Sequence, residues 1–303
     1  MRVVADDGVA LDVTVDLPEA PGPSACVVAL HAAAFGERAH PLYDHLRDTL
    51  VPTGAGVVVY DRRGSGASGG VAEVPLGRLA EDALAVVHAV GDLPEVDAAR
   101  IGVWGISQGG WLGPMAAGAD DAIAFVVAVS ASGVSPSVQM HFAMENVLRE
   151  HGFGDAAVAA AHDVRSRIEA ALRAGDAVAT GAAIEEAGHE PWSAHAYLPS
   201  IEDVEQPDPF EIDLDAAAVF ASVRVPTLAI YGAWDRWVPI EPSVDAWRTA
   251  FADRPGLLTV ERIDGVGHMM TTPDDPRDPN ENGPIGPAYG AALRAWIARV
   301  AST

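Results

Sequence analysis

The feature that most constrains the fold of this chain is a regular alternation between short apolar runs and amphipathic helical patterns. An unbroken apolar run such as 26–30 is typical of a strand buried on both faces of a parallel sheet. Parallel strands need crossover connections, and right-handed crossovers through helices are the rule. The expected strands of the first part are 9–17, 26–30, 56–60, 101–104 and 124–129, and the expected helices are 40–51, 76–90 and 111–119. Residues 9–17 alternate between apolar and polar side chains, which predicts an edge strand.

The pattern changes after Ser130 and returns at Pro226. Between them the chain is Ala-rich, acidic and helical, with no convincing strand. The returning pattern predicts strands at 227–231 and 257–263, helices at 242–252 and 289–301, and a loop at 271–287. We therefore expect one α/β core (1–133 and 222–303) with a mostly parallel central sheet flanked by helices, interrupted by a helical cap, or lid, at 134–221. An insertion after a strand would lie at the carboxyl edge of the sheet, where ligands bind in open α/β folds.

Charge and composition exclude several classes of protein. Asp and Glu number 43 against 19 basic residues, all Arg and scattered, so the net charge of −24 disfavours nucleic acids and anionic membranes. No apolar window is long enough for a transmembrane helix. Cys26 is the only cysteine, and no histidine spacing indicates a metal site, so we expect neither a metal nor a cofactor. The N-terminus is acidic where an export signal would be apolar, which predicts a cytoplasmic protein and leaves a homodimer open.

The strongest chemical motif is Gly105-Ile-Ser107-Gln-Gly109. It follows an expected strand and precedes an expected helix, which is the context of a nucleophile elbow. A nucleophile on such a sharp turn is held in a strained backbone conformation, and the flanking positions must be small. The dipoles of the helix that begins here favour negative charge beside Ser107. We therefore predict that Ser107 is a catalytic nucleophile.

A serine hydroxyl needs a general base, and the base needs an orienting acid. Asp235 lies just past the expected strand 227–231, and His268 just past 257–263. The resulting order of Ser, Asp and His is that of nucleophile-elbow enzymes. Asp264 competes for the acid role but precedes a glycine-rich turn, so we favour Asp235.

Acyl transfer also requires donors for the developing negative charge. One is expected from the backbone N–H of Gln108, which follows the nucleophile. The other should come from the loop after the strand 26–30, where we choose Ala33 with Ala32 as runner-up, and His31 is expected to brace that loop. The turn 61–68 (DRRGSGAS) is glycine-rich but lacks the ending of a phosphate-binding loop, so no nucleotide site is predicted.

These motifs together resemble the α/β-hydrolase superfamily over nearly the whole chain. The elbow GISQGG, the turn DRRGSGAS, the acid loop GAWDRWVP and the base loop GVGH stand in family order, most like serine esterases of the prolyl-oligopeptidase and dienelactone-hydrolase branches. The resemblance implies that the family's nucleophile, acid and base correspond to Ser107, Asp235 and His268. One departure is His31-Ala32, where the family usually has His-Gly. The extra methyl group of Ala32 would narrow the oxyanion hole or shift its N–H group.

We therefore predict a serine hydrolase that acts on the ester or related acyl bond of a small molecule through an acyl-enzyme. The candidate pocket residues are Trp111, Trp234, Trp237, Phe35 and Met140. A peptidase, thioesterase, lactonase, C–C hydrolase or acyltransferase would use the same residues, because fold does not decide the bond. A peptidase of this branch usually has a large extra domain, for which the chain has no room. A non-catalytic ligand-binding protein of this fold is the alternative from another class.

Overall fold

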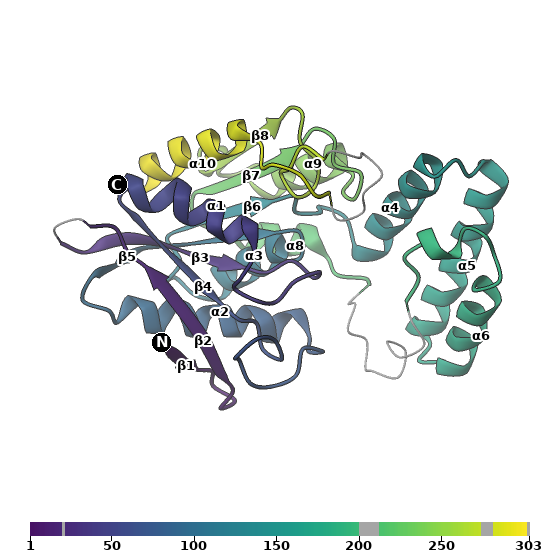
Figure 1. The fold of residues 1–303 in the computed structure, drawn as a ribbon, viewed down its shortest axis with the longest axis horizontal. Helices are drawn as coiled ribbons and strands as arrows, with labels where there is room; N and C mark the ends of the chain where they lie inside the picture. Colours follow the sequence, from purple (N-terminus) through teal and green to yellow (C-terminus); the bar gives the residue numbers. More distant parts are fainter. Residues whose placement is uncertain (20–21, 200–211, 274–280, 302–303) are drawn as a thin grey trace.

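The computed structural model describes residues 1–19, 22–199, 212–273 and 281–301. An eight-stranded sheet with the order β1-β2-β4-β3-β5-β6-β7-β8 forms its centre (Figure 1). The strands are β1 (Arg2–Val4), β2 (Ala10–Asp16), β3 (Ser24–Leu30), β4 (Ala55–Tyr60), β5 (Val96–Ile106), β6 (Phe125–Val129), β7 (Thr227–Gly232) and β8 (Leu258–Ile263). Strands β3 to β8 are parallel, and β2 pairs antiparallel with both β1 and β4. The predicted mostly parallel sheet is thus confirmed.

The predicted edge position of the strand at 9–17 is wrong. Its structural counterpart β2 is covered on one side by β1, a strand of three residues that we did not expect. Three residues are too few to show a recognisable alternation, and two of the three are exposed. A strand this short can be recognised only once its pairing with β2 is known.

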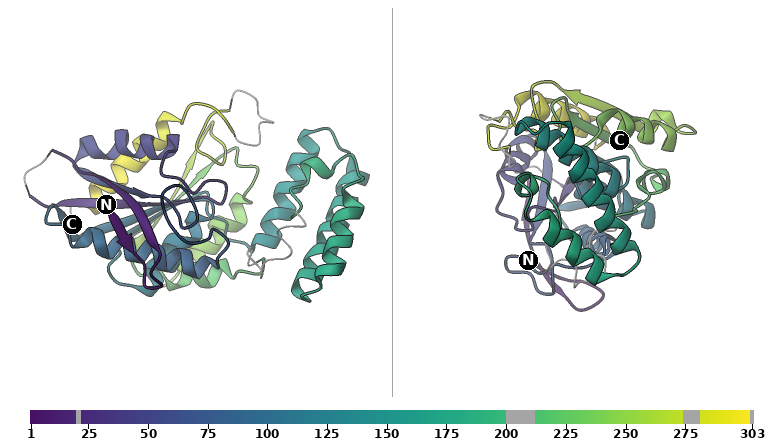
Figure 2. Two further views of the ribbon diagram at one scale, coloured as in Figure 1. Left: turned by 60° about the horizontal axis from the view of Figure 1, so that its bottom comes forward. Right: turned by 90° about the vertical axis from the view of Figure 1, so that its right-hand side faces the viewer.

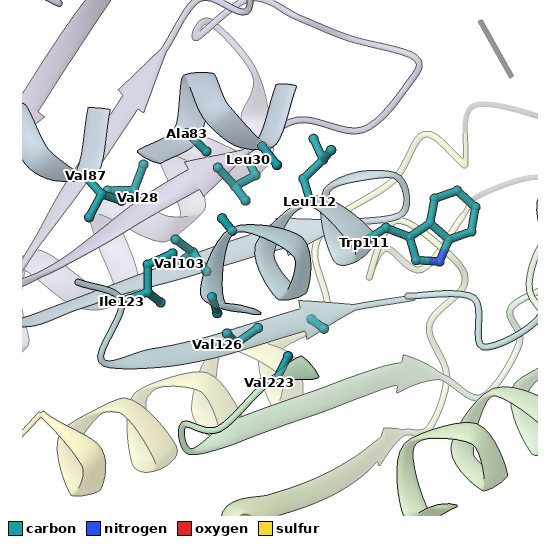
Figure 3. Packing of buried hydrophobic residues seen from close by; sticks show 14 of the residues in the cluster. Val28, Leu30, Ala83, Val87, Val103, Trp111, Leu112, Ile123, Val126 and Val223 are labelled. Atoms are coloured by element: carbon teal, nitrogen blue, oxygen red, sulfur yellow. The ribbon is translucent and has the colours of Figure 1, made fainter. Parts of the chain in front are cut away.

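Helices cover both faces of the sheet. Helices α1 (Pro41–Leu50) and α10 (Pro287–Val300) pack on one face, and α2 (Leu76–Gly91), α3 (Gly109–Ala119), α8 (Ala216–Ser222) and α9 (Ile240–Ala250) on the other. Consecutive strand residues point to opposite faces, so Val27 and Val28 are both fully buried but belong to different hydrophobic clusters. Figure 3 shows the second face, where Val28, Val103 and Val126 of neighbouring strands surround α3.

The segment between β6 and β7 forms a helical insertion, defined here as 134–221. Its helices are α4 (Pro136–Glu150), α5 (Asp155–Arg173) and α6 (Ala177–Ala187), and its last helix, α8, returns to the sheet. Helices α4 to α6 project beyond the sheet in Figure 1 and in the left view of Figure 2. They enclose a small hydrophobic cluster of their own, which includes Met144, Ile168 and Trp192. The described part of the insertion contains no strand.

Three-residue 3₁₀ turns at Val51–Thr53, Ser193–His195 and Pro255–Leu257 complete the secondary structure of the described residues. Across that part of the molecule, no helix combines the length and apolar character that crossing a membrane would require.

Candidate active site

Ser107 lies in a sharp turn between β5 and α3. Its φ of 55° is in the left-handed region, which few residues other than glycine adopt. The backbone N–H of Ser107 donates to the Val129 carbonyl (2.9 Å), and the Ser107 carbonyl accepts from Gly110 N–H (2.9 Å). The serine is thus partly exposed on a strained strand-to-helix turn, which is the geometry that a nucleophile at this position would need.

The turn at Ser107 depends on the absence of a side chain at position 105. A Cβ on Gly105 would lie 2.0 Å from the carbonyl oxygen of Gly109. Both groups are backbone, so neither can move aside as a flexible side chain would. Position 105 must therefore be a glycine, because the backbone segments on the two sides of Ser107 approach too closely for a side chain.

His268 and Asp235 form a buried pair at the same edge of the sheet. His268 Nδ1 is 2.9 Å from Asp235 Oδ2 and therefore donates to the carboxylate. Asp235 Oδ1 accepts the backbone N–H groups of Trp237 (2.8 Å) and Val238 (3.0 Å), so the carboxylate is fixed on both oxygens. Asp264, the competing acid, is exposed and lies outside this pair.

A close approach of two loops makes this pair possible. Gly232 ends β7, and a Cβ there would lie 2.2 Å from the Gly267 carbonyl oxygen. The absence of that side chain lets the loop that carries Asp235 pass directly beside the loop that carries His268. Gly232 thus has a packing reason.

The backbone around Ser107 is also linked to the backbone of His268. The hydroxyl of Ser130 donates to the His268 carbonyl (2.8 Å), and the preceding residue, Val129, accepts the N–H of Ser107 (2.9 Å). Ser130 has a φ of 49° and is fully buried at the end of β6. The end of β6 therefore holds the serine turn and the histidine loop in one rigid arrangement.

The charged groups around His268 raise the pKa of its imidazole ring. Burial by itself lowers the pKa of His268, but the charge of Asp235, the hydrogen bond that His268 donates to Asp235 and the charge of Glu281 outweigh it, so the pKa is raised above 6.5. With Nδ1–H facing Asp235, the neutral ring has an unprotonated Nε2 that can accept a proton. The arrangement can therefore act as an oriented general base at pH values above the raised pKa of His268.

Glu281 is a buried carboxylate that the sequence did not indicate. Its Oε2 accepts the backbone N–H of Met269 (3.0 Å), and its Oε1 lies 3.9 Å from Arg236 Nε. Burial raises the pKa of Glu281, the charge of His268 and the Met269 contact lower it, and the result is a pKa above 4.5. Glu281 reaches the histidine loop from a stretch without regular structure, so periodicity and strand ends gave no signal for it.

The loop after β3 lies beside the serine turn. His31 is buried, and its Nε2 donates to the Tyr60 carbonyl (2.6 Å), which braces the loop as expected. Burial lowers the pKa of His31 to about 4, so the ring is neutral. Ala32 is buried and Ala33 is exposed, while Gln108 is partly exposed and immediately precedes α3 as its N-cap residue.

The five candidate pocket residues lie in different environments. Trp111 is buried at one end of the cluster in Figure 3, and its indole N–H donates to the Ser132 carbonyl (2.6 Å). Trp234 is 62% exposed. Phe35 stacks on His40 at a ring distance of 3.7 Å, and Met140 is half-buried on α4.

Trp237 lies nearest to the buried pair. Its ring is 6.4 Å from that of His268, and Tyr197 of the helical insertion packs edge-on against it at 4.8 Å. Trp237 is therefore the candidate pocket residue at which the insertion and the histidine loop meet.

Residues 7–262 match the X-Pro dipeptidyl-peptidase family (S15 family). The chain belongs to this family. This S15 chain has no match among curated proteins. In the described part of the family member, no group of three or more His, Cys, Asp or Glu side chains could hold a metal ion.

Several solved structures share the fold of this S15 chain. Est1E from Butyrivibrio proteoclasticus, with bound ferulic acid, is 18% identical with a TM-score of 0.64, and the match covers 100% of both chains. An esterase from Pyrococcus furiosus is 18% identical (TM-score 0.63), covering 99% of this chain and 88% of its own. A proline iminopeptidase from Mycobacterium smegmatis is 17% identical (TM-score 0.59; 100% and 98%). The expected α/β-hydrolase fold is thus confirmed.

Proposed function

We propose that this protein is a serine hydrolase that cleaves a carboxylic ester of a small molecule through an acyl-enzyme on Ser107. The observation that carries the proposal is the strained turn at Ser107, which the end of β6 links to the loop of the buried, hydrogen-bonded His268–Asp235 pair. Neither feature serves the packing of the core, and strained residues cluster at functional sites.

In the proposed reaction, His268 Nε2 takes the hydroxyl proton while Ser107 Oγ bonds to the acyl carbon. The carbonyl electrons move to the oxygen, and this oxyanion is stabilised by the backbone N–H groups of Gln108 and Ala33. The C–O bond to the alcohol then breaks, and the alcohol leaves with the proton from His268. Water repeats the sequence on the acyl-enzyme, and the acid product is released. Asp235 keeps the proton on Nδ1 throughout and stabilises the imidazolium.

The helical insertion is proposed to cap the site and to select the substrate. Trp237 places an aromatic ring beside His268, and Tyr197 packs against Trp237, which favours substrates with an apolar or aryl group. Ferulic acid in Est1E is such an aryl acid. We infer a small, uncharged or weakly charged ester, because the net charge of −24 repels polyanions.

A second candidate activity, removal of X-Pro dipeptides from peptides, is favoured by the family match. The same serine, histidine and aspartate would cleave an amide in place of an ester. Such an enzyme must also bind the free α-ammonium group of its substrate, which calls for a carboxylate in the pocket. Besides Asp235, Glu281 is a buried carboxylate whose charge acts on His268, but it already accepts a hydrogen bond from the Met269 backbone, so we rank ester cleavage first.

The deciding experiment is intact mass spectrometry after exposure to a fluorophosphonate, with Ser107→Ala beside the wild type. One adduct on the wild type and none on the variant supports an activated serine. Short and aryl p-nitrophenyl esters are then compared with an X-Pro dipeptidyl p-nitroanilide. Faster turnover of the anilide would move peptide cleavage to first place. No adduct on the folded wild type contradicts the serine hydrolase and favours a ligand-binding protein.

A further inference from the structure

We propose that Arg62 is a positioning residue that ties together the two donors of the oxyanion hole. This role rests on the function proposed above. Arg62 follows β4, and one of its terminal nitrogens, Nη1, donates to the side-chain oxygen Oε1 of Gln108 (3.2 Å) and to the Ala32 carbonyl (3.4 Å). One guanidinium thus contacts both the serine turn and the loop after β3, which are far apart in the sequence.

The contact with Ala32 acts on the proposed donor Ala33 through a single peptide group. The Ala32 carbonyl and the Ala33 N–H belong to the same planar unit and, in a trans peptide, point in opposite directions. Holding the carbonyl therefore fixes the direction of the N–H. A cation on the carbonyl side also polarises the peptide, which makes its N–H a stronger donor.

The contact with Gln108 acts on the other proposed donor. Gln108 is the first residue after the nucleophile, and its backbone N–H is the expected partner of the oxyanion. Because its side chain is held by Arg62, the turn and the neighbouring loop keep one spacing. The backbone N–H of Arg62 also donates to the Gly36 carbonyl (2.7 Å), which anchors the arginine itself to that loop.

Arg62 differs from its neighbour Arg63 in the groups that its guanidinium contacts. Arg63 is buried and fully engaged with carboxylates, because its guanidinium meets Asp82 (2.6 and 2.5 Å) and Asp7 (2.9 Å). Arg62 has no carboxylate within ion-pairing distance among residues 1–19, 22–199, 212–273 and 281–301.

The neighbouring carboxylate is engaged elsewhere, since Asp61 accepts the backbone N–H groups of Arg38 (2.8 Å) and Ala67 (2.9 Å). In a chain with a net charge of −24, a partly buried cation without a carboxylate partner is unusual. Its charge remains available to the site.

The consequence is specific to the transition state. Negative charge develops on the substrate oxygen only after Ser107 has attacked, so donors that Arg62 aims and strengthens affect kcat more than KM. The side chains of Arg62 and Gln108 would not touch the substrate in this role, and they would act through the two N–H groups.

The test compares Arg62→Met, Arg62→Lys and wild type, with Arg248→Met as a control that removes an exposed arginine of α9. The readouts are kcat and KM on a p-nitrophenyl ester and the inhibition constant of a trifluoromethyl ketone, which forms a tetrahedral oxyanion on the serine. For Arg62→Met we expect kcat to fall about 10- to 100-fold with KM nearly unchanged. The ketone should bind more weakly by a similar factor, and lysine should recover part of the loss.

An unchanged kcat, or a KM effect without a change in ketone affinity, overturns this role for Arg62. Where Arg62→Met does not fold, Gln108→Met removes the shared side-chain contact but keeps both backbone donors. That variant should reproduce the loss of kcat, and a wild-type kcat overturns the role. Ser107→Ala runs in parallel: if it retains activity, the proposed serine mechanism itself fails, whereas its inactivity beside a fully active Arg62→Met contradicts only the role of Arg62.

Discussion

The sheet core and the helical insertion are stabilised in different ways. The core buries continuous apolar strands on both faces, so its geometry follows from close packing. Both regions bury ionisable groups, but the insertion has the smaller apolar cluster. There, Glu169 accepts from the Ser137 hydroxyl (2.6 Å), and Arg165 donates to the Tyr197 carbonyl (2.7 Å). Packing fixes positions more rigidly than a few polar contacts do. Under the proposed function, we expect the core to place the reacting groups and the insertion to vary with the substrate.

The two regions meet through polar contacts near the buried pair. Asn146 of α4 donates from Nδ2 to the Arg236 carbonyl (2.9 Å), and Arg236 pairs with Glu150 (2.7 Å). Arg236 directly follows Asp235 in the sequence, so the insertion is attached to the loop that carries the acid. Variants in each region should therefore affect different quantities.

The largest effect is expected from Asp235→Asn in the core. The amide oxygen can still accept the N–H groups of Trp237 and Val238, but its NH₂ group would face His268 Nδ1 and favour the wrong tautomer. We expect kcat to fall by about 10³- to 10⁴-fold with the fold intact. The measurement is steady-state kinetics with circular dichroism.

The matched variant in the insertion is Glu169→Gln, which also changes a buried carboxylate to an amide. It should lower the melting temperature and leave kcat within about two-fold, since polar contacts of this kind contribute about 1 kcal/mol. Equal losses of kcat in the two variants would contradict the division of roles.

Gly105→Ala should have the next largest effect. The new Cβ would meet the Gly109 carbonyl, so the turn must shift and move Ser107. We expect at least about a 100-fold loss of kcat, because displacements near 1 Å have such effects. Unfolding free energy should fall by about 1–3 kcal/mol, as for other overpacked sites.

The control for this variant is Gly181→Ala in α6, where a Cβ would meet nothing within 4 Å. Alanine in a helix interior is favoured over glycine by about 0.5–1 kcal/mol, so this variant should be slightly more stable and fully active. Chemical denaturation and kcat measure both. A destabilised Gly181→Ala would mean that the insertion is packed as tightly as the turn.

Glu281→Gln should change the pH dependence more than the maximal rate. The charge of Glu281 contributes to the raised pKa of His268, which must be neutral to act as a base. Removing the charge lowers that pKa, so the acidic limb of the kcat/KM profile should move to lower pH, by up to about one unit. The plateau at higher pH should change little.

The control for Glu281→Gln is Glu261→Gln, which removes an exposed carboxylate of β8. Its profile should coincide with that of the wild type. A shift of the acidic limb toward higher pH in Glu281→Gln would contradict the electrostatic role of Glu281.

Asn146→Ala should have the smallest effect. It removes the hydrogen bond between α4 and the Arg236 carbonyl, worth about 1 kcal/mol. We expect KM to rise about five-fold or less, with kcat unchanged, because the insertion would be held less firmly while the buried pair stays in place. Gln139→Ala on the same helix is the control, and a fall in kcat with constant KM would show that the insertion contributes to chemistry.

Much of the candidate site was predictable because strand ends are recognisable in the sequence. Ser107, Asp235 and His268 each follow an apolar run, and parallel strands bring their carboxyl ends to one edge. Glu281 and Arg62 were not predicted as site residues. Their roles depend on how irregular loops fold back, and neither periodicity nor motif spacing describes such paths. The pocket residues were also difficult to predict from the sequence. Trp234 is exposed, and Trp111 is buried in the first turn of α3.

The sequence by itself determined the alternation of strands and helices, the place of the insertion and the residues of the serine turn. These features are local: side-chain periodicity and the need for small residues at a sharp turn are set within a few positions of the chain. The sequence favoured Asp235 over Asp264, but only the tertiary structure brings Asp235 to His268. Only the tertiary structure, likewise, decided that Arg62 joins two loops while Arg63 is neutralised by Asp82. Such choices depend on distances between segments far apart in the chain, which packing alone sets.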